Sequence, residues 1–153
     1  PFTADNHLWG RPVSADTATY TDNGRPLLYA GPSNKSPATA AYATTLQERA
    51  ARIRLAHPEK SGQPIPVDLL TESGSGLDPH ISPAAAEFQV ERLARATGFT
   101  AAEVRRTIAM YTQGRTLGLL GEARVNVLEV NLALEGLLPN GRTASVASAA
   151  APR

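Results

Sequence analysis

Apolar residues recur at helical spacing in several separate segments of the chain. In the first of these segments they are spaced by four, four and three positions: Tyr42, Leu46, Ala50 and Ile53. This spacing places them on one face of an α-helix. Ser36-Pro37 offers an N-cap followed by a first-turn proline, so the pattern predicts a helix from Ser36 to about His57.

Two further helices are predicted close together in the second half of the chain. The first follows the cap Ser82-Pro83 and ends at Gly98, and its apolar face holds Ala86, Val90, Leu93, Ala94 and Thr97. The second begins at a capping box formed by Thr100 and Glu103, and Gly114 follows it as a terminator. The short connection between the two helices is typical of an αα-hairpin.

Shorter apolar runs predict strands. Gln63–Leu70 is bounded by prolines and is too short for a helix, so it predicts a strand, and the leucines of 117–120 predict a second one. Leu27–Tyr29 is a further candidate near the N-terminus. Val125–Leu137 fits both an alternating strand and a helix, and its length favours the helix.

Together these elements predict one small α+β domain with about four helices and a short sheet. Residues 1–36 are rich in proline and turn signals, which predicts an extended, loop-rich arm. Burial of Trp9 is expected to anchor this arm, with a surface recognition role for Trp9 as the alternative. Residues 37–138 form the predicted α+β core, and the small, polar residues 139–153 predict a disordered tail.

Composition narrows the possible classes of function. Fifteen Lys and Arg residues face fourteen Asp and Glu residues, so the net charge is +1, which argues against a dedicated nucleic-acid binder. The chain has no cysteine, which removes thiol nucleophiles, disulfides and cysteine-ligated zinc. No run approaches the roughly 18 apolar residues that a membrane-spanning helix needs. Because the chain begins at Pro1, we expect a longer protein whose start includes any signal or anchor.

The loop Thr71–His80 gathers most of the chemically reactive side-chain types. Its Ser73-Gly74-Ser75-Gly76 run is typical of a phosphate cradle, because glycines let backbone N–H groups approach an anion, but neither a Walker loop nor a G-x-G-x-x-G pattern follows. Ser75, Asp78 and His80 are the residue types of a hydrolytic triad, but triads are assembled from distant parts of a chain. We favour a structural loop that positions the next helix, with nucleotide binding and serine hydrolysis as alternatives.

The other titratable residues predict no catalytic or metal-binding centre. The three histidines share no metal-ligand spacing: His7, His57 and His80. Glu87 and Glu91 lie on a predicted helix that also carries Arg92 and Arg95, as on an ordinary solvated face. No acid–base pair stands out, so we predict no catalytic residue and no metal ligand.

A group of basic residues lies on the first predicted helix and just after it: Arg49, Arg52, Arg54 and Lys60. Such a group is typical of a patch that binds phosphate or lipid. Because Glu48 and Glu59 interrupt it, we favour a solvated helix face.

Six stretches of sequence, taken together, are more specific than any single motif: Trp9–Pro12, Gly31–Asn34, Val67–Ala86, Tyr111–Gly118, Gly121–Leu128 and Asn131–Leu134. They closely resemble the C subunit (KdpC) of Kdp-type potassium-transporting P-type ATPases. The resemblance covers most of residues 9–135, and the Ala-rich tail after Gly136 lies outside it.

The resemblance implies an accessory subunit that is not itself an enzyme. Members of the family have one N-terminal transmembrane helix in the bacterial inner membrane, followed by a soluble domain that is generally extracytoplasmic. The start of this chain resembles a point shortly after that anchor. The family subunit joins a channel-like, potassium-selecting subunit to an ATP-hydrolysing pump subunit, stabilises their assembly, and acts as a catalytic chaperone that raises the ATP affinity of the pump.

The resemblance also has consequences for the candidate sites. It implies that this chain binds no cofactor tightly and that any contact with ATP is made through the pump subunit. Gly, Pro and exposed polar groups concentrate in two segments, which gives these candidates for contact with the channel-like subunit: Leu77, Asp78, Pro79, His80, Ser82, Gly114, Arg115 and Gly118. The alternative is a regulatory module that binds nucleotide directly, with phosphate held by Ser73, Gly74, Ser75, Gly76 and Arg115.

Overall fold

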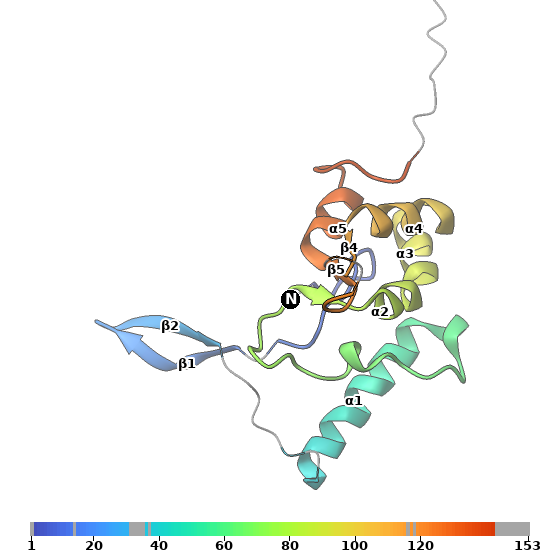
Figure 1. Cartoon of the computed structure of the whole chain (residues 1–153). Helices are drawn as coiled ribbons and strands as arrows, with labels where there is room; N and C mark the ends of the chain where they lie inside the picture. The colour runs from blue at the N-terminus through green and yellow to red at the C-terminus, as the bar shows by residue number, and fades with distance from the viewer. Residues whose placement is uncertain are drawn as a thin grey trace, which may run out of the picture.

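The computed structural model describes residues 2–13, 15–30, 36, 38–115, 117 and 119–142. These residues contain five α-helices: α1 (Ala40–Ala56), α2 (Pro83–Phe88), α3 (Val90–Thr97), α4 (Ala101–Met110) and α5 (Val127–Leu134). Their strands are β1 (Ala15–Asp22), β2 (Arg25–Ala30), β3 (His80–Ile81), β4 (Thr112–Gln113) and β5 (Arg124–Asn126). The predicted class, a single small α+β domain of about four helices with a short sheet, is confirmed (Figure 1).

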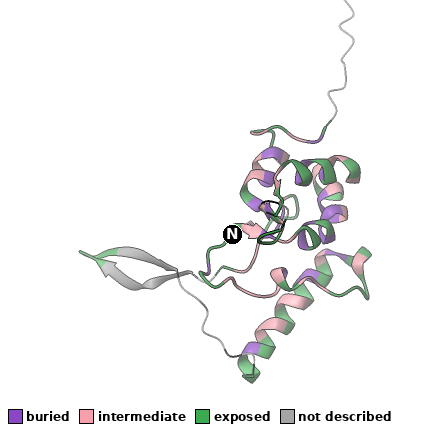
Figure 2. Cartoon of the chain, in the orientation of Figure 1, coloured by how far each residue is buried: buried purple, intermediate pink, exposed green. Residues whose placement is uncertain are grey.

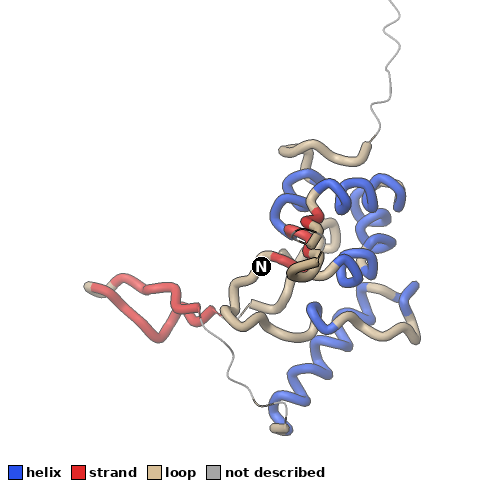
Figure 3. The backbone as a smooth tube through the Cα atoms, viewed as in Figure 1, coloured by secondary structure: helices blue, strands red, loops and turns tan. Residues whose placement is uncertain are grey.

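The predicted N-terminal arm contains a β-hairpin. Strands β1 and β2 pair antiparallel, and the candidate strand Leu27–Tyr29 lies within β2. The turn is Asn23-Gly24, with φ of 48° and 79°, which is the positive-φ geometry of a type I′ hairpin turn. Figures 1 and 3 show this hairpin standing apart from the helices.

A second, three-stranded sheet lies among the helices. Strand β5 is central, with β3 and β4 antiparallel on either side, and the buried Val125 pairs with both Ile81 and Thr112. The predicted strand at Gln63–Leu70 is wrong. Its prolines lack the N–H groups that a sheet needs, and the segment instead ends in a 3₁₀ turn at Val67–Leu69.

The predicted strand at the leucines of 117–120 does not form at Leu117 and Leu119, whereas Leu120 makes an isolated bridge and Gly118 lies outside the described residues. Leu117 and Leu119 are 91% and 79% exposed in the connection between β4 and β5. The sheet is formed by the more polar segments that flank this connection, because strand pairing depends on a partner across the sheet as well as on apolar character.

Local cap signals predicted most helix ends correctly. The Ser82 hydroxyl accepts from Ala85 N at 3.2 Å, and the capping box of Thr100 and Glu103 is present. Gly98 ends α3 with φ of 72°. The first helix, however, is capped by Thr39 and not by Ser36-Pro37, and Pro37 itself lies outside the described residues.

Tertiary contacts changed three other predicted boundaries. The helix expected from Ser82-Pro83 to Gly98 breaks at Gln89 into α2 and α3. The next helix ends at Met110, before Gly114, because the chain enters β4 at Thr112. The segment from Val125 was favoured as a helix, and it is helical from Val127 to Leu134, whereas Val125 and Asn126 belong to strand β5.

One apolar core joins α2–α5, the three-stranded sheet and the N-terminal segment (Figure 2). Its largest fully buried apolar side chains include Leu8, Leu93, Val90, Val104, Val125 and Val130. The expected burial of Trp9 is confirmed at 9% exposure. Helix α1 is largely exposed, with Tyr42 and Ile53 as its buried residues.

The core extends a short way into the predicted tail. Gly141 is buried, and its N–H donates to Thr107 Oγ1 at 2.8 Å. A Cβ at position 141 would lie 2.3 Å from the backbone oxygen of Glu103, so this contact with α4 requires glycine. Residues 143–153 lie outside the described part of the chain.

Candidate functional site

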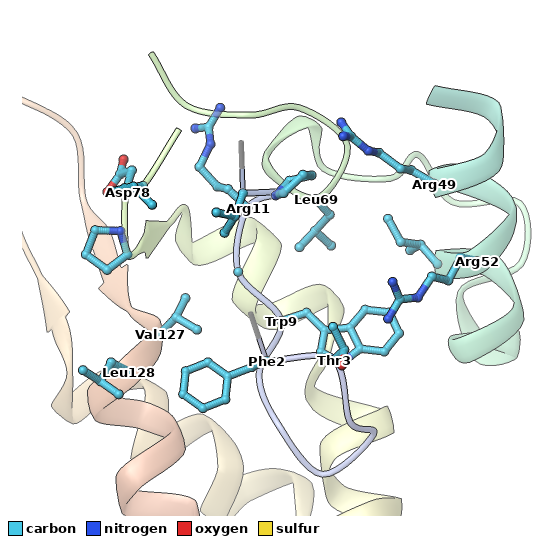
Figure 4. Close-up of a pocket in the computed structure, with 16 residues that line it drawn as sticks. Phe2, Thr3, Trp9, Arg11, Arg49, Arg52, Leu69, Asp78, Val127 and Leu128 are labelled. Carbon is cyan, nitrogen blue, oxygen red and sulfur yellow. The ribbon is translucent and has the colours of Figure 1, made fainter. Parts of the chain in front are cut away.

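An apolar groove lies between the N-terminal segment, α1, α5 and the loop before β3 (Figure 4). Its volume of about 360 Å³ is at the lower end of the range typical of ligand pockets. The groove is lined by Phe2, Thr3, Trp9, Gly10, Arg11, Pro12, Val13, Arg49, Arg52, Ile53, Leu69, Leu77, Asp78, Pro79, Val127 and Leu128. Most of these side chains are apolar, so the groove favours an apolar guest.

Two of the arginines that line the groove are engaged by carboxylates of the protein. Arg11 Nη1 lies 3.4 Å from Asp68 Oδ1, and Arg49 Nη2 lies 2.6 Å from Glu72 Oε1. The hydrogen bond to Glu72 raises the pKa of Arg49 above its usual value. These two cations are therefore largely neutralised within the protein.

Arg52 differs from both. It forms no ion pair with any of the described residues, and its guanidinium carbon lies 5.0 Å from the ring centroid of Trp9 (Figure 4). Arg92 lies 4.2 Å from the centroid of the same ring. Both contacts have cation–π geometry, so the indole holds Arg52 at the groove while no described carboxylate pairs with its charge.

Two buried amide side chains hold the N-terminal segment against the helices. Asn131 accepts from Leu8 N at 2.6 Å and donates to Leu8 O at 3.0 Å. Gln89 repeats this arrangement at Trp9, with distances of 2.8 Å and 3.0 Å. Each amide thus satisfies both backbone groups of one residue, as a neighbouring strand would. These contacts position Trp9, whose side chain lines the groove.

A buried arginine extends this attachment. Arg92 is 2% exposed and donates to the backbone carbonyls of Asp5 and His7 and to Gln89 Oε1. Its Nε also donates to His57 Nε2 at 3.0 Å. Burial lowers the pKa of Arg92 to about 10, so it remains a cation at neutral pH. We call the four buried polar residues the arm clamp: His57, Gln89, Arg92 and Asn131.

The hydrogen bonds of His57 require a neutral ring. Its Nδ1 lies 2.8 Å from Ile53 O, and because a carbonyl only accepts, Nδ1 carries the proton. Its Nε2 accepts from Arg92, so a second proton there would face a cation. Burial lowers the pKa of His57, and the charge of Arg92 lowers it further. The arm clamp is therefore built around an uncharged imidazole.

The serine hydroxyls of the Ser73–Gly76 loop bond to the backbone of the same loop. Ser73 Oγ accepts from Asp78 N at 3.2 Å, and Ser75 Oγ accepts from Leu77 N at 3.4 Å. Gly76 has φ of 74°, and its N–H donates to Ser73 O at 3.1 Å. Gly74 is exposed between the two serines. These bonds account for the shape of the loop, and phosphate binding by it stays a prediction.

The end of this loop reaches the groove. Leu77, Asp78 and Pro79 line it, which brings part of one predicted contact segment to the candidate site. Asp78 Oδ1 lies 3.0 Å from His80 Nδ1. Within the described residues no hydrogen bond joins Ser75 to His80, so the order of contacts that a hydrolytic triad needs is not formed there.

The second predicted contact segment lies in the connection between β4 and β5. Arg115 Nη2 lies 2.9 Å from Glu122 Oε2, and neither Gly114 nor Arg115 lines the groove. Gly118 is outside the described residues. The structure therefore brings only the first of the two segments to the groove.

The described residues hold neither a metal-binding cluster nor a spanning helix. No group of three or more His, Asp or Glu side chains converges there in a way that would hold a metal ion. No helix in that part of the chain combines the length and the apolar character needed to cross a membrane.

The arm clamp was not predicted from the sequence, although a signal for it exists. Gln89 interrupts the apolar face between Ala86 and Val90, and Asn131 follows Val130 within an apolar helix. A polar residue on a buried face needs a hydrogen-bond partner, and here the backbone of the N-terminal segment supplies it.

Comparison with known proteins places the chain among subunits of a potassium-transporting ATPase. Residues 1–136 match the family model described as "KdpC: K+-transporting ATPase, c chain". The chain is 51% identical over 138 residues to the potassium-transporting ATPase KdpC subunit of Clostridium botulinum (strain Alaska E43), covering 90% of this chain and 69% of the relative. The subunit of the same name from Sorangium cellulosum is 52% identical over 136 residues, covering 89% and 68%.

Proposed function

The chain belongs to the KdpC family, the c chain of K⁺-transporting ATPases, and from this premise we propose that it is an accessory subunit of an ATP-driven potassium uptake complex. In this role it joins a channel-like, potassium-selecting subunit to an ATP-hydrolysing pump subunit and stabilises their assembly. It catalyses no reaction itself and acts as a catalytic chaperone that raises the pump's affinity for ATP.

The observation that carries this proposal is the groove. Its lining includes the exposed side chains of Val13, Leu77 and Leu128, and it contains Arg52, whose charge no described carboxylate pairs. Concave apolar surface with a polar rim is typical of a protein-interaction site. The arm clamp fixes one wall through Trp9, so the groove is preformed, which lowers the entropy lost when a partner binds.

The proposal also includes a location. The described domain faces the extracytoplasmic side of the bacterial inner membrane and is tethered by a single N-terminal transmembrane helix that precedes Pro1. ATP is then contacted by the pump subunit on the opposite side of the membrane. The influence of this subunit on ATP affinity is transmitted through the assembly.

Expression of the complex with and without this subunit tests the proposed function. Without it, we expect the channel-like and pump subunits to lose stable co-purification and the KM of the pump for ATP to rise. A complex that assembles fully and keeps its KM for ATP in the absence of the subunit would refute the proposal.

A charge reversal tests the contribution of the groove segment. Asp78→Lys removes the carboxylate that accepts from His80 N and lies against the His80 ring, which disturbs the loop end on the groove lining, and we expect it to reduce assembly and potassium uptake. Glu48→Lys is the matched control, because it makes the same charge change at an exposed position of α1 that does not line the groove. Equal assembly in the two variants would exclude Asp78 from the contact.

A further inference from the structure

We propose that the groove holds an extended segment of a partner protein in which an apolar side chain lies next to a carboxylate, and that this carboxylate pairs with Arg52. The inference rests on the proposed function and adds the chemistry of the partner segment. Three features of the groove support it: its lining, the pairing of its arginines, and backbone groups along one edge that have no hydrogen-bond partner among the described residues.

The lining calls for an apolar side chain. Val13, Leu77 and Leu128 are 43%, 56% and 48% exposed, and they surround deeper apolar walls formed by Ile53, Leu69 and Val127. Burying exposed apolar surface on binding removes it from water and favours the complex. An apolar side chain of the guest therefore buries most surface where the exposed residues of the lining meet its deeper apolar walls.

The pairing of the arginines that line the groove favours a guest that carries a carboxylate. Arg11 and Arg49 face Asp68 and Glu72, so their charges are compensated within the protein. Asp78, the acidic residue of the lining, lies against His80 and forms no ion pair with Arg52 among the described contacts. Arg52 is thus the arginine of the lining that has no carboxylate partner among the described residues, and a carboxylate on the guest would pair with it through charge-assisted hydrogen bonds.

The backbone favours a peptide over a lipid as the guest. Among the described residues, the backbone N–H and C=O groups of Gly10, Arg11 and Val13 form no hydrogen bond, and all three residues line the groove. An extended peptide binds such an edge by adding main-chain hydrogen bonds, which a lipid chain does not supply.

Photo-crosslinking in the assembled potassium-transporting complex tests the inference. Leu128 is replaced by p-benzoylphenylalanine, and the crosslinked peptide is identified by mass spectrometry. Leu55 is replaced in the same way as a control, because it is 85% exposed and does not line the groove. We expect position 128, and not position 55, to capture a segment of another subunit that carries an apolar residue beside Asp or Glu.

Charge variants then test the pairing with Arg52. We expect Arg52→Glu to reduce the yield of that crosslink by about tenfold or more, since it places two anions in contact. Arg54→Glu makes the same change on an exposed position of α1 outside the groove, and we expect less than a twofold loss. Reversing the captured carboxylate to Arg should restore the crosslink to the Arg52→Glu variant, and Arg52→Lys should retain it. The urea midpoint of each variant shows whether the domain remains folded.

Several outcomes would overturn the inference: capture of a lipid, of a second copy of this chain, or of a segment without a carboxylate, or equal losses with Arg52→Glu and Arg54→Glu. If the subunit co-purifies with the complex and position 128 captures nothing, the groove is not the contact and the proposed function stands. If the subunit does not co-purify with the complex at all, both the proposed function and this inference fail.

Discussion

The arm clamp and the Ser73–His80 loop are both rich in polar side chains, but they use them in opposite ways. The clamp residues are 0–2% exposed, and Gln89, Arg92 and Asn131 bond to backbone groups far away in the sequence. The loop residues bond to atoms two to five residues away, close to solvent. A buried polar group has no water to replace a lost partner, so the clamp fixes the fold while the loop leaves it largely unaffected.

The clamp and the loop also contribute to the groove in different ways. The clamp holds Trp9, and the Trp9 ring contacts Arg52, so the position of this arginine depends on contacts deep in the core. The loop, by contrast, contributes side chains to the groove rim at Leu77 and Asp78 without supporting the core. Substitutions in the two regions should therefore separate stability from binding.

The largest effect should follow from removal of the buried arginine. Arg92→Leu leaves two backbone carbonyls and His57 Nε2 without their donor and removes one of the two donors of Gln89 Oε1, and we expect a loss of about 3 kcal/mol in the free energy of unfolding. Arg95→Leu is the control on the same helix. The Arg95 side chain is 52% exposed, so its ion pair with Glu59 should contribute less than about 1 kcal/mol. Urea unfolding measures both, and equal losses would show that the clamp is not a special site.

A smaller difference should separate one clamp residue from one loop residue. Asn131→Ala removes both hydrogen bonds to Leu8 and leaves a buried N–H and C=O unpaired, so we expect a loss of about 2 kcal/mol. Ser73→Ala also removes an acceptor from a backbone N–H, but water can replace it there, and the expected change is within about 0.5 kcal/mol. A loss in Ser73→Ala as large as that in Asn131→Ala would contradict the proposed role of burial.

The clamp should also make stability depend on pH. The pKa of His57 is lowered in the folded protein, so below pH 6.5 the unfolded chain binds a proton that the folded chain does not. The free energy of unfolding should therefore fall as pH drops below about 6.5, with a slope of at most about 1.4 kcal/mol per pH unit from this group, and stay constant above it. His57→Gln keeps an acceptor for Arg92 and should remove this part of the slope, while His80→Gln in the loop should keep it. Identical slopes for all three proteins would show that His57 does not control this dependence.

Sequence patterns predicted what is decided locally. The caps at Ser82 and Thr100 and the left-handed Gly98 depend on bonds within a few residues, and each was found. The break at Gln89 was not predicted, because it depends on a backbone partner 80 residues away. The strands β4 and β5 were missed for a similar reason, since their short polar segments become strands only by pairing with each other.

The candidate site likewise contains residues that the sequence predicted and one that it did not. Leu77, Asp78 and Pro79 were chosen from the sequence as surface contacts, and they line the groove. Arg52 was interpreted as part of a solvated face together with Arg49. Sequence spacing does not show that Glu72 neutralises Arg49 across 23 residues, nor that no described carboxylate reaches Arg52. The feature that distinguishes the two arginines exists only in three dimensions.

The smallest effects should come from the residues that suggested nucleotide binding. Ser75→Ala removes an exposed hydroxyl and Arg115→Ala an exposed ion pair with Glu122, so each should change the free energy of unfolding by less than about 0.5 kcal/mol. Titration calorimetry of the chain with ATP, with and without magnesium, should give no saturable heat at millimolar concentration. The serine oxygens already accept from amides of their own loop, and Arg115 is paired with a carboxylate. Saturable ATP binding that is lost in Arg115→Ala would instead make the loop a nucleotide site and this subunit a direct regulator of ATP affinity.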